Sequence, residues 1–135
     1  MHAQGDRIEH RAWLDYAERD LSAARALWSI GDGHREAVVY WAQQSAEKAL
    51  KAVLVLEEAA IPRTHDLAVL RSLSRAYTGG GAAHEDLSLL TRQAAGSRYP
   101  DLYVPLDDDD VLRALACAES VITEVTRIIT EKENR

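Results

Sequence analysis

Residues 42–52, AQQSAEKALKA, form the centre of a long helical pattern in this sequence. Alanines return after three or four residues, which is the spacing of one helix face, and the apolar stripe continues on both sides. The pattern predicts a helix over about residues 34–59, and Pro62 ends the segment. Leu50 and Leu54 widen the stripe, so this helix is expected to pack against more than one neighbour. The stripe itself consists of Val38, Trp41, Ala42, Ala46, Ala49, Val53 and Leu56.

Another long helix is predicted on the N-terminal side, starting near Arg7 and ending near Ile30. Asp6, followed three residues later by Glu9, is typical of a capping box at a helix start. Gly31 is the kind of residue that commonly follows the last turn of a helix. The apolar residues at helical spacing are Trp13, Ala17, Leu21, Ala24 and Trp28.

Two shorter helices are predicted in the middle of the chain. Thr64 or Asp66 can cap the first of them, which ends before the glycines at 79–81. The second runs over about 84–95, and the following segment, 96–105, contains two prolines and is expected to be a loop. No segment shows the alternating pattern of a strand.

The last helix is opened by Asp107–Asp110, because acidic side chains favour the positive end of a helix dipole. A metal site is a weaker interpretation of this run, since consecutive carboxylates on a helix point in different directions. Five helices with short connections predict an all-α, up-and-down helical bundle. We expect one domain over 1–135, with a core of about 7–130. The apolar stripe of the last helix is Val111, Leu115, Ala118, Ile122, Val125 and Ile129.

Composition narrows the class of protein. Hydrophobic residues make up 47% of the 135 residues, which is enough for one core, and the formal net charge is -6. That charge argues against tight, non-specific binding to a nucleic-acid backbone, although it is compatible with a local basic pocket.

The single Cys117 is expected to be a small core residue, and no apolar run is long enough to span a membrane, so a cytoplasmic protein is expected. No metal or cofactor motif occurs. Because Phe is absent, bulky packing in the core or at a dimer interface is expected from Trp13, Trp28 and Trp41.

Several short patterns, in order, closely resemble the bacterial and archaeal HEPN domains (higher eukaryotes and prokaryotes nucleotide-binding). The stretch AQQSAEKALKA is the most specific of them, and the resemblance extends from about Trp13 to Ile129. The others are Ala17, Asp20, Leu21 and Ala24 in the first helix, THDL at 64–67 and SRYP at 97–100.

The resemblance implies a helical bundle that often forms homodimers. Such proteins are frequently encoded beside a small nucleotidyltransferase of the minimal type, and many of these pairs look like toxin–antitoxin modules. Many family members are ribonucleases with an Arg followed, after four to six residues, by a His. No histidine of this chain has an Arg at that distance, so the enzyme assignment stays open. A tyrosine near that motif can be modified by the nucleotidyltransferase in relatives, but without the motif no tyrosine here is assigned.

The corner before the third helix is one half of the candidate site. His65 beside Asp66 is suited to acid–base chemistry, because a histidine titrates near neutral pH. The alternative is structural, with Asp66 capping the helix and His65 bonded across the bundle. Lys48 and Lys51, on one face of their helix, form either a basic edge for a phosphate or a solvated face with a Glu47–Lys51 pair.

The other half is the pair Arg98 and Tyr99 in the loop before Pro100. Arg provides a bidentate fork suited to phosphate, and Tyr provides a ring on which a base can stack. The alternative is that Arg98 pairs with a carboxylate and Tyr99 closes one end of the bundle.

Three functions follow as hypotheses. The first is one component of a nucleotidyltransferase-linked, toxin–antitoxin-like pair that contacts a nucleotide or RNA phosphate through Arg98 and the His65–Asp66 corner. The second is a metal-independent ribonuclease, in which His65 acts as general acid or base and Arg98 stabilises the charge of the reacting phosphate. The third is a helical interaction module that binds only its partner protein.

Overall fold

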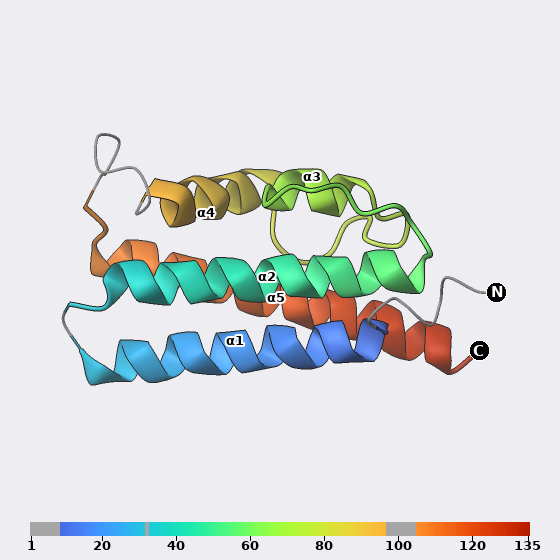
Figure 1. Cartoon of the computed structure of the whole chain (residues 1–135), viewed down its shortest axis with the longest axis horizontal. Helices are drawn as coiled ribbons and strands as arrows, with labels where there is room; N and C mark the ends of the chain where they lie inside the picture. The colour runs from blue at the N-terminus through green and yellow to red at the C-terminus, as the bar shows by residue number, and fades with distance from the viewer. Residues whose placement is uncertain (1–8, 32, 97–104) are drawn as a thin grey trace.

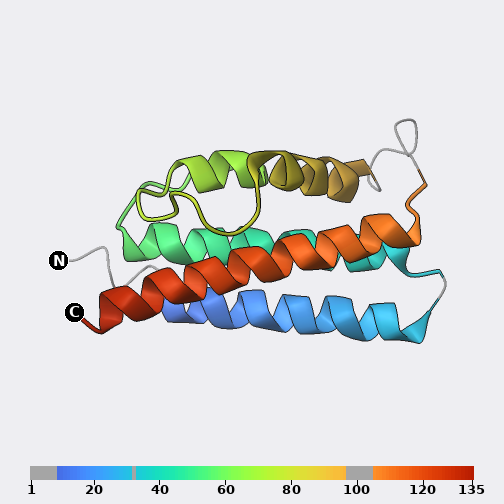
Figure 2. The same cartoon turned by 180° about the vertical axis from the view of Figure 1, so that it is seen from behind.

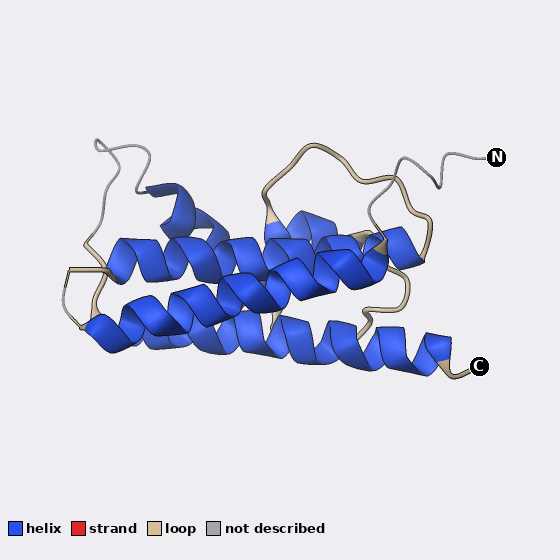
Figure 3. Cartoon of the chain, turned by 60° about the horizontal axis from the view of Figure 1, so that its bottom comes forward, coloured by secondary structure: helices blue, strands red, loops and turns tan. Residues whose placement is uncertain are grey.

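The computed structural model describes residues 9–31, 33–96 and 105–135. The described residues form helices and no strand, so the predicted all-α class is confirmed (Figures 1 and 3). The helices are α1 (His10–Ile30), α2 (Arg35–Leu56), α3 (Leu67–Ser72), α4 (His84–Gly96) and α5 (Asp108–Glu133).

Helix α2 lies at the centre of the bundle. It runs antiparallel to α1, and α5 lies alongside both, while α3 and α4 follow one another along the opposite side of α2 (Figures 1 and 2). Helix α2 therefore contacts each of the other four helices, which confirms the expectation from its wide apolar stripe. Fully buried alanines on α2 explain the close packing, because small side chains let neighbouring helices approach.

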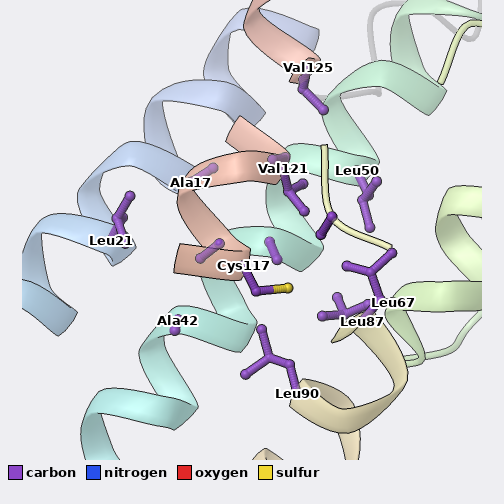
Figure 4. Close-up of a cluster of buried hydrophobic side chains, with 14 of the residues drawn as sticks. Ala17, Leu21, Ala42, Leu50, Leu67, Leu87, Leu90, Cys117, Val121 and Val125 are labelled. Carbon is purple, nitrogen blue, oxygen red and sulfur yellow. The ribbon is translucent and has the colours of Figure 1, made fainter. Parts of the chain in front are cut away.

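Leucine, valine and alanine make up most of the core. In Figure 4, leucines of α2, α3 and α4 meet valines of α5, and the buried Cys117 lies among them, as predicted. The three tryptophans pack against this core but remain partly exposed, so they cover its rim and do not fill its centre.

The buried face of α5 is wider than the predicted stripe. Ala114, Cys117 and Val121 are buried as well, whereas Leu115 and Ile122 are only partly buried. The reason is that α5 contacts α1, α2 and α4 and so buries more than one line of side chains. In the described part of the chain, no helix is both long and apolar enough to span a membrane.

The helix ends confirm some predictions and correct others. Helix α1 begins at His10, and Glu9 is its extended N-cap without a side-chain cap bond, so the predicted capping box with Glu9 inside the helix is wrong. Asp66 caps α3, and Asp107 and Asp110 form a reciprocal capping box at the start of α5. The acidic run therefore acts as a helix start, as expected.

Candidate functional site

A buried carboxylate on α2 forms the centre of the candidate site. Glu47, with a side chain only 5% exposed, accepts hydrogen bonds from three directions. The donors are Lys51 Nζ at 2.8 Å, His65 Nδ1 at 3.0 Å and Gln43 Nε2 at 3.2 Å. A charged group is costly to bury without such partners, so this network compensates for the loss of hydration.

The pKa of Glu47 reflects this balance. Burial by itself raises the pKa, but hydrogen bonds from Lys51, His65 and Gln43 outweigh burial and hold the pKa below its ordinary value. Glu47 is therefore a carboxylate near neutral pH, and its negative charge faces the imidazole of His65.

The side chain of His65 contacts Glu47 through Nδ1 and is otherwise largely exposed to solvent. Its side chain is 67% exposed, while its Nδ1 lies against Glu47 and its backbone carbonyl accepts a 3.0 Å hydrogen bond from Gln43 Nε2. A carboxylate at Nδ1 favours the tautomer that carries the proton there, which leaves Nε2 facing away from Glu47. An imidazole oriented in this way can accept or donate a proton at Nε2.

The neighbouring Asp66 has a structural task. Its Oδ1 accepts from the backbone N–H groups of Ala68 and Val69, at 3.0 and 3.3 Å. The backbone N–H of Leu67, the residue directly after Asp66, donates to Thr91 Oγ1 on α4 at 3.1 Å. The corner that carries His65 is therefore anchored to α2 on one side and to α4 on the other, and the predicted capping by Asp66 is confirmed.

Lys48 and Lys51 both face α1. Lys48 Nζ pairs with Asp20 of α1 at 2.6 Å, and Lys51 Nζ lies 5.5 Å from the centre of the Trp13 ring while it pairs with Glu47. The Glu47–Lys51 pair was predicted from the spacing of four residues, and it is present. Each lysine thus has a carboxylate partner, so neither forms a fully solvated face.

The structure thus brings together His65, Glu47 and Lys51, with Lys48 one turn earlier on the α1 side of the same helix. Arg98 and Tyr99 lie outside the described residues, so their meeting with His65 stays a prediction. Among the described residues, no group of three or more His, Cys, Asp or Glu side chains could hold a metal ion.

Sequence reasoning did not identify Glu47 as the centre of the network, Gln43 as a member of it, or Asp20 as the partner of Lys48. The spacing Gln43, Glu47, Lys51 is a visible signal, because residues four apart share a helix face. The contacts of Glu47 with His65 and of Asp20 with Lys48 join distant segments, and no local spacing predicts them.

Comparison with known proteins agrees with this architecture. Two solved structures have a similar fold: ST0689, an archaeal HEPN homologue (27% identity, TM-score 0.70, 90% of this chain and 99% of that chain), and TT1696 from Thermus thermophilus (24% identity, TM-score 0.75, 88% and 97%). No curated protein matches the chain. The family model of the HEPN domain matches residues 10–129, and the chain therefore belongs to the HEPN domain family.

Proposed function

We propose that this HEPN-domain chain is one component of a nucleotidyltransferase-linked, toxin–antitoxin-like pair and that it binds a nucleotide or RNA phosphate at the His65 corner. The observation that carries the proposal is the exposed imidazole of His65, fixed from behind by the buried carboxylate of Glu47. A rigidly held side chain with one open nitrogen is suited to contact a phosphate oxygen, because its orientation needs no further ordering.

Charge around the corner is compatible with an anion. The carboxylate of Glu47 is compensated by Lys51, so an anion bound at His65 would not face an unpaired negative charge. In the proposal, Arg98 adds a guanidinium fork for phosphate and Tyr99 a ring for stacking on a base.

Calorimetric titration of the whole chain with nucleoside triphosphates tests the proposal. Binding is expected for the unaltered chain and is expected to weaken about tenfold in His65→Ala, the loss typical of one hydrogen bond to a charged group. His84→Ala is the matched control, because His84 is exposed at the first residue of α4. Equal affinity in His65→Ala and the unaltered chain would contradict the proposal.

A metal-independent ribonuclease is the second candidate, and the Glu47–His65 contact favours it. A carboxylate behind an imidazole fixes its orientation and its tautomer, as general acid–base catalysis requires. Structured RNA incubated with the chain in EDTA is the test. Cleavage that disappears in His65→Ala and persists in His84→Ala supports an enzyme, whereas cleavage that is unchanged in His65→Ala belongs to a contaminant.

Two apolar side chains beside the corner support a homodimer as part of the proposal. Val69 and Leu73 are each 41% exposed and lie four residues apart at α3, directly after the His65 corner. Neighbouring exposed apolar side chains mark interaction surfaces, so we place the dimer contact there, with two corners near the interface.

Light scattering at micromolar concentration tests this dimer. The unaltered chain is expected to be a dimer and the Val69→Asp/Leu73→Asp variant a monomer, because two buried carboxylates would lack partners. Leu112→Asp is the control, since Leu112 is 50% exposed on α5. A strictly monomeric unaltered chain would exclude the dimer.

The proposed partner protein is a small nucleotidyltransferase, on the strength of family membership. Co-expression with the product of the adjacent gene, followed by size-exclusion chromatography, is the test. A complex that forms without any nucleotide binding by this chain would favour the third candidate, a helical interaction module.

A further inference from the structure

A hollow of about 420 Å³ lies away from the His65 corner, at one end of the bundle. Figure 1 shows the C-terminal ends of α2 and α5, together with the segment after α3, at the end of the molecule that carries the C label. The apolar part of the lining of the hollow comes from Leu56, Ala76 and Ile128. Its volume falls in the range typical of pockets for small molecules.

Three cations on this hollow have no acidic partner in the part of the chain that the structure describes. Arg75, Lys132 and Arg135 line it, and within the described residues no ion pair or side-chain hydrogen bond involves their charged groups. Positive side chains gathered in one place repel each other, although solvent and salt screen part of the repulsion. The gathering stands out on a chain whose net charge is -6.

The acidic side chains of the same hollow bond to groups other than these three cationic side chains. Glu57 accepts hydrogen bonds from Ser74 Oγ at 2.9 Å and from the backbone N–H groups of Arg75 and Ala76, at 3.0 and 3.1 Å. These bonds fix the segment that carries Arg75. Glu131 accepts a 2.8 Å hydrogen bond from Arg127, which also holds Glu124, so these charges are largely balanced.

We propose that this terminal hollow, defined by Arg75, Lys132 and Arg135 around an apolar lining, binds a phosphate-type anion with at least two negative charges. Guanidinium groups donate paired hydrogen bonds to phosphate oxygens, and an ammonium group adds a mobile point charge. The apolar lining offers contact to an organic body attached to the phosphate. The site is separate from the His65 corner, because Glu47 precedes Leu56 by nine residues of α2, about 14 Å along a helix axis.

Calorimetric titration of the whole chain with pyrophosphate and, separately, with ATP tests the inference. Both are expected to bind, and tighter binding of ATP would identify a nucleotide as the source of the phosphate. Measured in the His65→Ala background, which removes the other proposed phosphate contact, the Arg75→Ala/Lys132→Ala substitutions are expected to lower the affinity for both anions at least about tenfold. Both side chains are exposed, so this variant is expected to fold, and circular dichroism checks that it does.

A matched control removes the same net charge elsewhere. Arg92 and Arg113 are exposed, and the Arg92→Ala/Arg113→Ala variant is expected to bind both anions as the unaltered chain does. An equal loss in this control would reduce the effect to overall charge and overturn the inference, as would a lack of binding of either anion at millimolar concentration.

The His65→Ala variant separates the two sites. It is expected to retain pyrophosphate binding, which would support the terminal hollow even if the proposed function at His65 fails. If His65→Ala abolishes binding of both anions while Arg75→Ala/Lys132→Ala retains it, the anion site is the His65 corner and the inference is wrong.

Discussion

Glu47 joins three side chains that reach it from different positions of the chain. Lys51 and Gln43 come from the same helix, one turn away on either side, whereas His65 comes from the corner before α3. Because the carboxylate is buried, removal of any one donor leaves part of it unsatisfied, which costs more than an exposed ion pair contributes. Glu47 is thus both a structural group and the support for the exposed imidazole.

Cys117 illustrates the opposite case, a potentially reactive group made inert by its surroundings. Burial among apolar side chains raises the pKa of its thiol to about 12, with a smaller contribution from Asp86 (Figure 4). The thiolate is the reactive form, so the folded chain is expected to react very slowly with a disulfide reagent at neutral pH. Absorbance of the released thiol measures this, with fast reaction expected in concentrated guanidinium chloride. Rapid reaction of the folded chain would contradict the burial.

At the scale of elements, the stability of α3 depends on the hydrogen bonds of its first turn. It has only six residues, too few to be stable as an isolated helix, and Asp66 satisfies two of its backbone N–H groups. We expect Asp66→Ala to lower the free energy of unfolding by about 1 kcal/mol. Urea denaturation followed by circular dichroism measures the change.

Asp109→Ala provides the control for this cap. Asp109 is exposed in the first turn of α5 and takes no part in the capping box, so its removal is expected to cost only a few tenths of a kcal/mol. Similar losses in the two variants would show that the helix dipole, and not the cap bonds of Asp66, determines the effect.

At the scale of the whole molecule, lowered carboxyl pKa values predict sensitivity to acid. The pKa of Glu124 lies below its ordinary value because of hydrogen bonds from Arg127, and that of Glu133 falls to about 2 because of Arg11 and His10. The pKa of Glu47 is lowered as well. Groups with lowered folded pKa values stabilise the fold above the ordinary pKa of about 4.5, and this contribution is lost as pH falls toward the folded values.

The urea midpoint is therefore expected to fall steadily between about pH 4.5 and about pH 2.5. Glu47→Gln is expected to make this decrease shallower, since the variant no longer takes up a proton at that position. His84→Ala is expected to leave the slope unchanged. A midpoint independent of pH over this range would contradict the lowered pKa values.

Sequence alone determined that these helices exist, although not all of their ends, because helix periodicity and capping are local properties. The apolar spacing around AQQSAEKALKA, the cap at Asp66 and the acidic start of α5 each involve residues within one or two turns. The same locality explains the predicted Glu47–Lys51 pair, which joins residues four apart.

Only the tertiary structure decided which distant groups meet. The pairing of Glu47 with His65 and of Lys48 with Asp20 follows from how α2 packs against the α3 corner and α1. The glycines at 79–81 predict the end of the third helix, but α3 already ends at Ser72. A Cβ on Gly80 would lie 2.5 Å from Glu124 Oε1 on α5. Such contacts depend on the relative placement of packed helices, which no short stretch of sequence contains.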